Sequence, residues 1–131
     1  MRSRSVLTSL VALGLVTVLV APVDGAAQVE VEASIAASIV DRMPENPATS
    51  FPSDVGTLYC WTRVSGAAGT TLQHVWIHDG QEHPVSLDIG GSPWRTWSSK
   101  EIPAEWSGDW TVEIRDAAGA VLQTLSFTVG M

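Results

Sequence analysis

Residues 72–89 read LQHVWIHDGQEHPVSLDI, and this stretch predicts a β-hairpin. Two runs rich in β-branched and other apolar side chains flank Asp79-Gly80, a dipeptide that favours the left-handed backbone of a two-residue hairpin turn. Such a turn pairs His78 with Gln81 across the two strands. The centre of the chain is therefore expected to consist of antiparallel strands.

The length of this turn decides which side chains of the hairpin share a face. A three-residue turn would shift the pairing by one residue and bury Val75 and Ile77, because side chains alternate along a strand. We expect the two-residue turn. It pairs His74 with Val85 and puts the following side chains on one face: His74, Trp76, Val85, Leu87 and Ile89.

On both sides of the hairpin the sequence continues in short strand-like segments separated by glycine or proline. Residues 29–39 alternate between apolar and polar side chains, although their alanines leave a helix over residues 32–40 as an alternative. Residues 43–54 contain three prolines and are expected to form a loop that Phe51 pins to the core. The remaining predicted strands are residues 58–64, 94–100, 110–115 and the last apolar segment, in which Leu125, Phe127 and Val129 share a face.

About seven short strands, with no convincing helix after the N-terminal segment, predict an all-β fold. We expect an antiparallel β-sandwich, either immunoglobulin-like or carbohydrate-binding-module-like, because two packed sheets bury one face of every strand. A small open or closed barrel is the alternative.

The six tryptophans all lie within residues 61–110. Trp94 and Trp97 are three positions apart, so a strand directs them to opposite faces. Trp110 alternates with polar neighbours and is expected in the core. Any site that these aromatic residues form is therefore a subset of the six.

Alternation also divides the strand over residues 58–64. Leu58 and Cys60 are expected to face the core, which leaves Tyr59 and Trp61 on an outer face. Large aromatic side chains there imply either a ligand or a covering segment. The loop over residues 43–54 is the candidate cover.

The N-terminus has the layout of a secretory signal peptide. Arg2 and Arg4 precede an apolar run over residues 6–21, which is shorter than the about 20 residues needed to span a bilayer. We predict a signal peptide over residues 1–27 and a single β-sandwich domain over residues 28–131. The product is expected to be exported, either to the periplasm or fully secreted, and an uncleaved anchor is the alternative.

Charge and cysteine content narrow the functional classes. Removal of the predicted signal peptide changes the formal net charge from −7 to −8, which repels phosphate backbones and argues against a nucleic-acid partner. No basic amphipathic helix is present, so no membrane contact is expected beyond the signal peptide. Cys60 is the only cysteine, and we expect a buried apolar residue rather than a reactive or intermolecular thiol.

Catalytic and metal signatures are weak. His74 and His78 lie about 13 Å apart on a strand, too far to share one ion whose ligands sit at about 2 Å, and no set with His83 is complete. Ser98 and Ser99 precede Lys100, but the G-x-S-x-G elbow of a serine nucleophile is absent. The sequence therefore predicts a protein that is not an enzyme and needs no cofactor or metal.

A binding surface fits the residues better. Exposed indole rings stack on sugar rings or peptide side chains, and neighbouring cations supply directed hydrogen bonds. The expected partner is a glycan or an envelope protein. One alternative is that the cluster only stabilises the fold, and a weaker one is a metal-assisted hydrolase. The candidate binding residues are Tyr59, Trp61, His74, Trp76, Arg95, Trp97 and Lys100.

Several motifs together resemble the bacterial domain of unknown function 2914. The resemblance spans nearly all of residues 28–131. It implies an exported or envelope-associated β-rich domain and carries no established activity, so no catalytic residues follow from it. Its motifs in this sequence are Asp41-Arg42-x-Pro44, Leu58-Tyr59-Cys60-Trp61-Thr62, His74-x-Trp76, Trp94-Arg95-Thr96-Trp97-Ser98-Ser99-Lys100, Gly108-x-Trp110-x-Val112 and Phe127-x-Val129.

Overall fold

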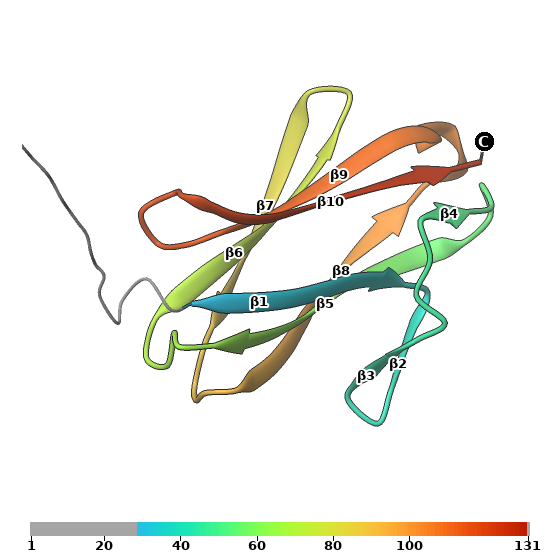
Figure 1. The fold of residues 1–131 in the computed structure, drawn as a ribbon. Coiled ribbons are helices and arrows are strands. Elements are labelled where there is room, and N and C mark those ends of the chain that lie inside the picture. The colour runs from blue at the N-terminus through green and yellow to red at the C-terminus, as the bar shows by residue number, and fades with distance from the viewer. Residues whose placement is uncertain (1–28, 131) are drawn as a thin grey trace, which may run out of the picture.

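The protein is a two-layer β-sandwich (Figure 1). A computed structural model describes residues 29–130, so the predicted signal peptide lies outside the described residues. Residues 30–36 form a strand and not the helix considered as an alternative. No helix in the described part of the chain is long and apolar enough to cross a membrane.

One layer is a three-stranded antiparallel sheet in the order β1-β5-β8. The other is a five-stranded sheet in the order β4-β10-β9-β6-β7, in which β4 runs parallel to β10 and all other pairs are antiparallel. The strands of the first sheet are β1 (Glu30–Ala36), β5 (Gly56–Ser65) and β8 (Trp94–Ile102). Those of the second are β4 (Ser50–Phe51), β6 (Thr71–His78), β7 (Gln81–Asp88), β9 (Gly108–Arg115) and β10 (Val121–Val129).

The connections between the layers are those of an immunoglobulin-like sandwich. The chain passes from β5 to β6 in the other sheet, returns to β8, and then crosses to β9 and β10. Strands β5 and β8 thus occupy the places of strands B and E, while β6, β9 and β10 occupy those of C, F and G. The sandwich prediction is confirmed, and its immunoglobulin-like form is the one found.

The predicted two-residue turn is also confirmed. His78 pairs with Gln81, and His74 with Val85. Asp79 and Gly80 have φ values of 50° and 76°, the left-handed backbone that this turn requires. His74 and Trp76 consequently face the space between the sheets and have no exposed surface.

The prediction of a loop over residues 43–54 is only partly right. Strand β3 (Met43–Glu45) pairs with β2 (Ser38–Val40) as a separate hairpin, and β4 pairs with β10. Phe51 is pinned to the core as expected, because its ring packs edge-on against Phe127 at 6.0 Å between centroids. Prolines and polar residues hide such short strands from a periodicity argument.

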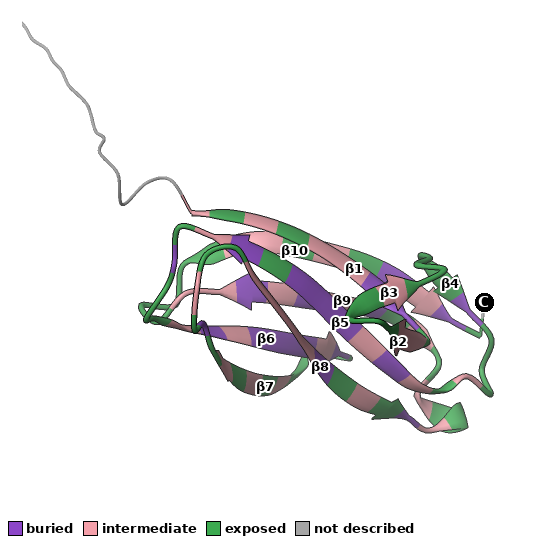
Figure 2. Cartoon of the chain, turned by 90° about the horizontal axis from the view of Figure 1, so that it is seen from below, coloured by how far each residue is buried: buried purple, intermediate pink, exposed green. Residues whose placement is uncertain are grey.

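The core lies between the two sheets (Figure 2). Cys60 and Leu58 are fully buried there, as alternation predicted, and Trp110 is 1% exposed. Gly90 packs directly on Trp94, since a Cβ atom on this glycine would lie 2.9 Å from the indole ring. The larger buried side chains of the core include Leu58, Leu72, Trp76, Ile89, Trp110, Val112, Ile114, Phe127 and Val129.

Candidate functional site

The seven candidate binding residues do not form one surface. Cross-strand pairing puts Tyr59, Trp61, Arg95 and Trp97 on the outer side of the three-stranded sheet. His74 and Trp76 lie in the interior with 0% exposure, which conflicts with a direct ligand contact. Lys100 lies at the far end of β8, where its Nζ is 5.0 Å from the ring centroid of Trp106.

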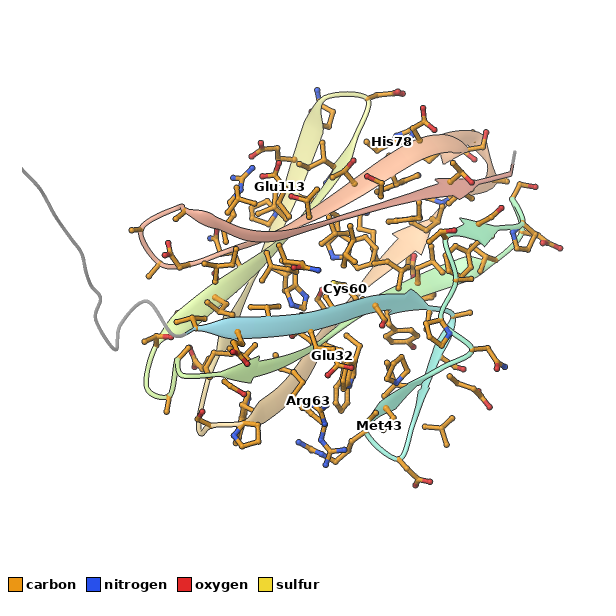
Figure 3. The ribbon with its side chains drawn as sticks, in the orientation of Figure 1. Glu32, Met43, Cys60, Arg63, His78 and Glu113 are labelled. Atoms are coloured by element: carbon orange, nitrogen blue, oxygen red, sulfur yellow. The ribbon has the colours of Figure 1, made fainter. Side chains whose placement is uncertain are left out.

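The outer side of this sheet is where Trp97 and Arg95 meet the β2–β3 hairpin. Trp97 pairs directly with Trp61, and Arg95 with Arg63, across β5 and β8. Trp94 faces the other way and packs against the core. Figure 3 shows Met43, on the hairpin, and Arg63 on this outer side of the sheet.

Trp61 is covered by the β2–β3 hairpin, which includes the first residues of the segment that we expected as its cover. Its indole N–H donates a hydrogen bond to the carbonyl oxygen of Arg42 at 2.9 Å, and its side chain is 1% exposed. Arg42 belongs to the turn of this hairpin and directly precedes the predicted cover of residues 43–54. Trp61 therefore supports the hairpin and presents no surface to a ligand.

The hairpin turn holds Arg42 in an unusual backbone conformation. Asp41 and Arg42 have φ values of 53° and 64°, and the left-handed region costs a non-glycine residue about 1–2 kcal/mol. This backbone directs the Arg42 guanidinium over the Trp97 ring, with 5.7 Å between Cζ and the centroid. The conformation thus serves to place a cation on an aromatic ring.

Two cations on this side have no carboxylate partner among the described residues. Arg63 pairs with Glu32 at 2.7 Å, and Arg115, on the other sheet, is held by two glutamates. Arg95 instead donates from Nη1 to the sulfur of Met43 at 3.4 Å. The Arg42 guanidinium lies over the Trp97 indole. We call Arg42, Met43, Tyr59, Arg95 and Trp97 the Trp97 face.

His74 belongs to a buried polar network that joins the two sheets. The Thr62 hydroxyl donates to the Thr96 carbonyl at 3.0 Å, so its oxygen accepts from His74 Nε2–H at 3.3 Å. His74 Nδ1 is then an acceptor for the Ser98 hydroxyl at 2.7 Å. The Ser98 oxygen accepts from the Trp76 indole N–H at 3.1 Å. Each hydrogen of this closed network has one acceptor, which fixes a neutral His74.

Burial lowers the pKa of His74 from 6.5 to about 4. The cause is desolvation, since the charged imidazolium would lose its water and could not accept from Ser98. Ser98 is itself 5% exposed and is committed to His74 and Trp76. This cluster acts as an inter-sheet lock.

Cys60 lies near this lock as a fully buried free thiol. Burial raises its pKa far above the ordinary value, because the thiolate would be desolvated.

The three histidines are divided between the core and one end of the sandwich. Within residues 29–130 no group of three or more histidine, cysteine or acidic side chains could hold a metal ion.

Trp106 is a site residue that sequence reasoning missed. It lies in a short 3-10 helix (Ala104–Trp106) between β8 and β9, a segment that falls between two predicted strands. Together with the β6–β7 turn it forms an open groove of about 500 Å³. A large aromatic residue inside a polar turn was the available signal, because such residues rarely serve the turn itself. The groove is lined by His78, Asp79, Gln81, His83, Glu105 and Trp106.

These features define a small immunoglobulin-like β-sandwich domain with a cationic, aromatic outer face and a separate groove. Residues 69–129 match the family model described as a protein of unknown function (DUF2914), which confirms the resemblance over this segment. The motifs at residues 41–44 and 58–62 lie outside the match. The matched segment holds β6 to β10, including Arg95, Trp97 and Trp106.

No curated protein matches the sequence. Among solved structures, the chain is similar to a β-glucosidase from Listeria innocua in complex with glucose, with 12% identity and a TM-score of 0.40. The alignment covers 79% of this chain and 16% of that one, so this chain spans a small part of that enzyme's length.

Proposed function

We propose that this domain is a non-enzymatic binding module of an exported protein, and that its Trp97 face binds an acidic polypeptide at the cell envelope. The observation that carries the proposal is the pair of arginines, Arg42 and Arg95, that lack a carboxylate partner within residues 29–130. The chain has a formal net charge of −7, so a surface that carries two guanidinium groups without carboxylate partners differs in charge from the protein as a whole.

The composition of the Trp97 face is typical of protein interfaces. Tryptophan, tyrosine, methionine and arginine are enriched in such interfaces, while lysine and glutamate are depleted. Met43 and Val40 add exposed apolar surface next to the arginines, at 39% and 48% exposure. They pair across β2 and β3 beside the turn, which gives a partner an apolar contact between two cations.

Charge complementarity selects an acidic partner. Each guanidinium offers several donors in a fixed fork that matches a carboxylate, and Arg42 and Arg95 keep these donors free of ion pairs. A basic partner would be repelled by both. Because such contacts are screened by salt, affinity should fall as ionic strength rises.

The non-enzymatic part of the proposal rests on the candidate nucleophiles. Ser98 is in the buried lock, and Cys60 is a fully buried thiol. The Lys100 ammonium lies over the Trp106 ring and not against either of these two side chains. The export part rests on the predicted signal peptide.

A second candidate function is purely structural, and one observation favours it. Arg42 contacts two indoles of the three-stranded sheet, through its carbonyl to Trp61 and its guanidinium over Trp97. The hairpin could therefore act only as a clamp on the sheet. In that case the arginines would contribute to stability and to no partner.

A peptide titration separates the two functions. The isotope-labelled protein is titrated with an acidic peptide of about ten residues that alternates glutamate and leucine, and with a matched lysine–leucine peptide. We expect the acidic peptide to shift the side-chain signals of Arg95 and Trp97 in NMR spectra. The lysine peptide should leave them unchanged.

Variants locate the contact. Arg95→Gln should weaken binding of the acidic peptide about tenfold, equivalent to about 1.4 kcal/mol, and leave the melting temperature unchanged. Arg115→Gln on the opposite sheet is the matched control. Trp97→Ala completes the comparison: lost stability alone favours the clamp, and lost binding at unchanged melting temperature favours the module. An acidic peptide that binds Arg95→Gln as tightly as the unchanged protein contradicts the proposal.

A further inference from the structure

The groove beside Trp106 is a concave site, at the end of the sandwich where the β6–β7 turn meets the β8–β9 connection. Its volume of about 500 Å³ lies within the range of about 300–1,000 Å³ for small-molecule sites. Figure 3 places His78 at this end of β6. None of its lining residues belongs to the Trp97 face.

Aromatic rings form the wall of the groove. The ring of Trp106 lies 6.0 Å from that of His78, nearly parallel at 11°, and 5.8 Å from that of His83. His78 in turn stacks on Trp110 at 4.5 Å, which anchors the wall to the core. A ring on such a support loses little freedom when a ligand stacks on it.

His78 carries a polar atom with no partner in this wall. Its Nε2 contacts the Ser107 carbonyl at 3.1 Å, and because a carbonyl only accepts, Nε2 holds the proton. In the neutral ring, Nδ1 is then a hydrogen-bond acceptor. That atom makes no hydrogen bond within the described residues, and Asp79 Oδ2 is 3.8 Å away. The side chain is 9% exposed, so a ligand hydroxyl would satisfy a buried group.

The rim is polar and carries more negative than positive charge. Asp79, Gln81 and Glu105 are exposed at its edge, and the carboxylates accept hydrogen bonds while the amide both donates and accepts. The Lys100 ammonium lies over the Trp106 ring of this wall, 5.0 Å from its centroid. An anionic ligand would meet two carboxylates here.

We propose that this groove binds the ring of a neutral sugar. The apolar face of a pyranose stacks on Trp106 and His83, and its hydroxyls donate to His78 Nδ1 and to the rim carboxylates. A purely apolar ligand would leave Nδ1 and the carboxylates unpaired. A charged sugar acid is disfavoured by Asp79 and Glu105. The module thereby has a glycan site that is separate from its polypeptide site.

The test is an NMR titration of the protein with defined sugars. The neutral probes are glucose, N-acetylglucosamine, cellobiose and diacetylchitobiose, and glucuronic acid is the anionic probe. We expect at least one neutral sugar to give saturable shifts at the Trp106 and His83 side chains, with a dissociation constant in the millimolar range typical of single small contacts. Glucuronic acid should bind at least about tenfold more weakly.

Two variants test the wall and the acceptor separately. Trp106→Ala removes the stacking surface and should weaken the bound sugar about tenfold. Because Trp106 also packs against the core, His78→Phe is the second variant: it keeps a ring on Trp110 and removes Nδ1. It should fold and bind the sugar at least about fivefold more weakly. Val121→Ala, at an exposed position of β10 that does not line the groove, is the control and should keep the affinity.

Three results would overturn the proposal. The first is an absence of saturable shifts at the groove with every neutral sugar up to about 50 mM. The second is tighter binding of glucuronic acid than of any neutral sugar. The third is unchanged affinity in both Trp106→Ala and His78→Phe. The sugar titration does not involve Arg42 or Arg95. A negative result therefore does not test the proposed polypeptide site.

Discussion

Acidification should weaken the protein through one residue, His74. Its pKa is about 4 in the folded protein and 6.5 as the ordinary value of an exposed histidine. Between these values the unfolded chain binds a proton that the folded chain excludes, so unfolding becomes easier as the pH falls. This loss of unfolding free energy is absent above pH 6.5. Below that pH, the loss grows by about 1.4 kcal/mol for each pH unit.

The full loss is reached near pH 4, where the folded protein also takes up the proton. The gap between 6.5 and about 4 corresponds to about 3 kcal/mol. That is a large share of the roughly 5–15 kcal/mol by which a domain is usually stable. The Ser98 hydroxyl explains why local rearrangement does not remove this loss, because it donates to Nδ1, which is an acceptor only in the neutral ring.

Urea unfolding at pH 7.0, 5.5 and 4.5 measures this loss. Carboxylates also titrate over the range, so His74→Gln is compared with the unchanged protein and His83→Gln serves as a matched histidine control. We expect the fall in unfolding free energy between pH 7.0 and 4.5 to be about 2–3 kcal/mol smaller in His74→Gln. NMR titration of the His74 ring gives the pKa directly. Equal pH dependence in all three proteins, or a His74 pKa above 6, would refute the reasoning.

Three further outcomes are expected. Gly90→Ala should destabilise the protein by about 1–3 kcal/mol in urea unfolding, because the new Cβ would lie 2.9 Å from the Trp94 ring. A Cβ on Gly119 meets no neighbouring atom, so Gly119→Ala is a control for backbone strain alone. Cys60 should resist iodoacetamide in the native protein and react in urea, as mass spectrometry would show, and native labelling would contradict its burial. Arg42→Gly should leave the unfolding free energy within about 1 kcal/mol, since relief of the left-handed backbone offsets the lost contact with Trp97, while acidic-peptide affinity falls.

Much of the fold was predictable because strands and turns leave local signatures. Asp79-Gly80 specifies its turn through backbone sterics alone, and the register of β6 and β7 follows from it. The strands within residues 43–54 were not predicted because they leave no such local signature. Three-residue strands such as β3 offer too few alternating positions for a pattern, and they exist because β2 and Trp61 lie next to them.

The candidate site was predictable only in part. Alternation correctly separated Trp94 from Trp97, and the motif around Arg95 pointed to the outer face that the structure contains. His74 was wrongly grouped with these residues, because a polar side chain among aromatics suggests a surface. Trp106 was missed because it precedes a strand and has no periodic partner.

The sequence by itself determined the all-β class, the hairpin register, and the division of the longer strands into two faces. Those properties depend on backbone sterics and on the two-residue repeat of a strand. Only the tertiary structure decided that the β2–β3 hairpin covers Trp61 and that His74 and Ser98 meet across the sheets. Each of these contacts joins residues far apart in the chain, and their proximity arises only when the two layers pack.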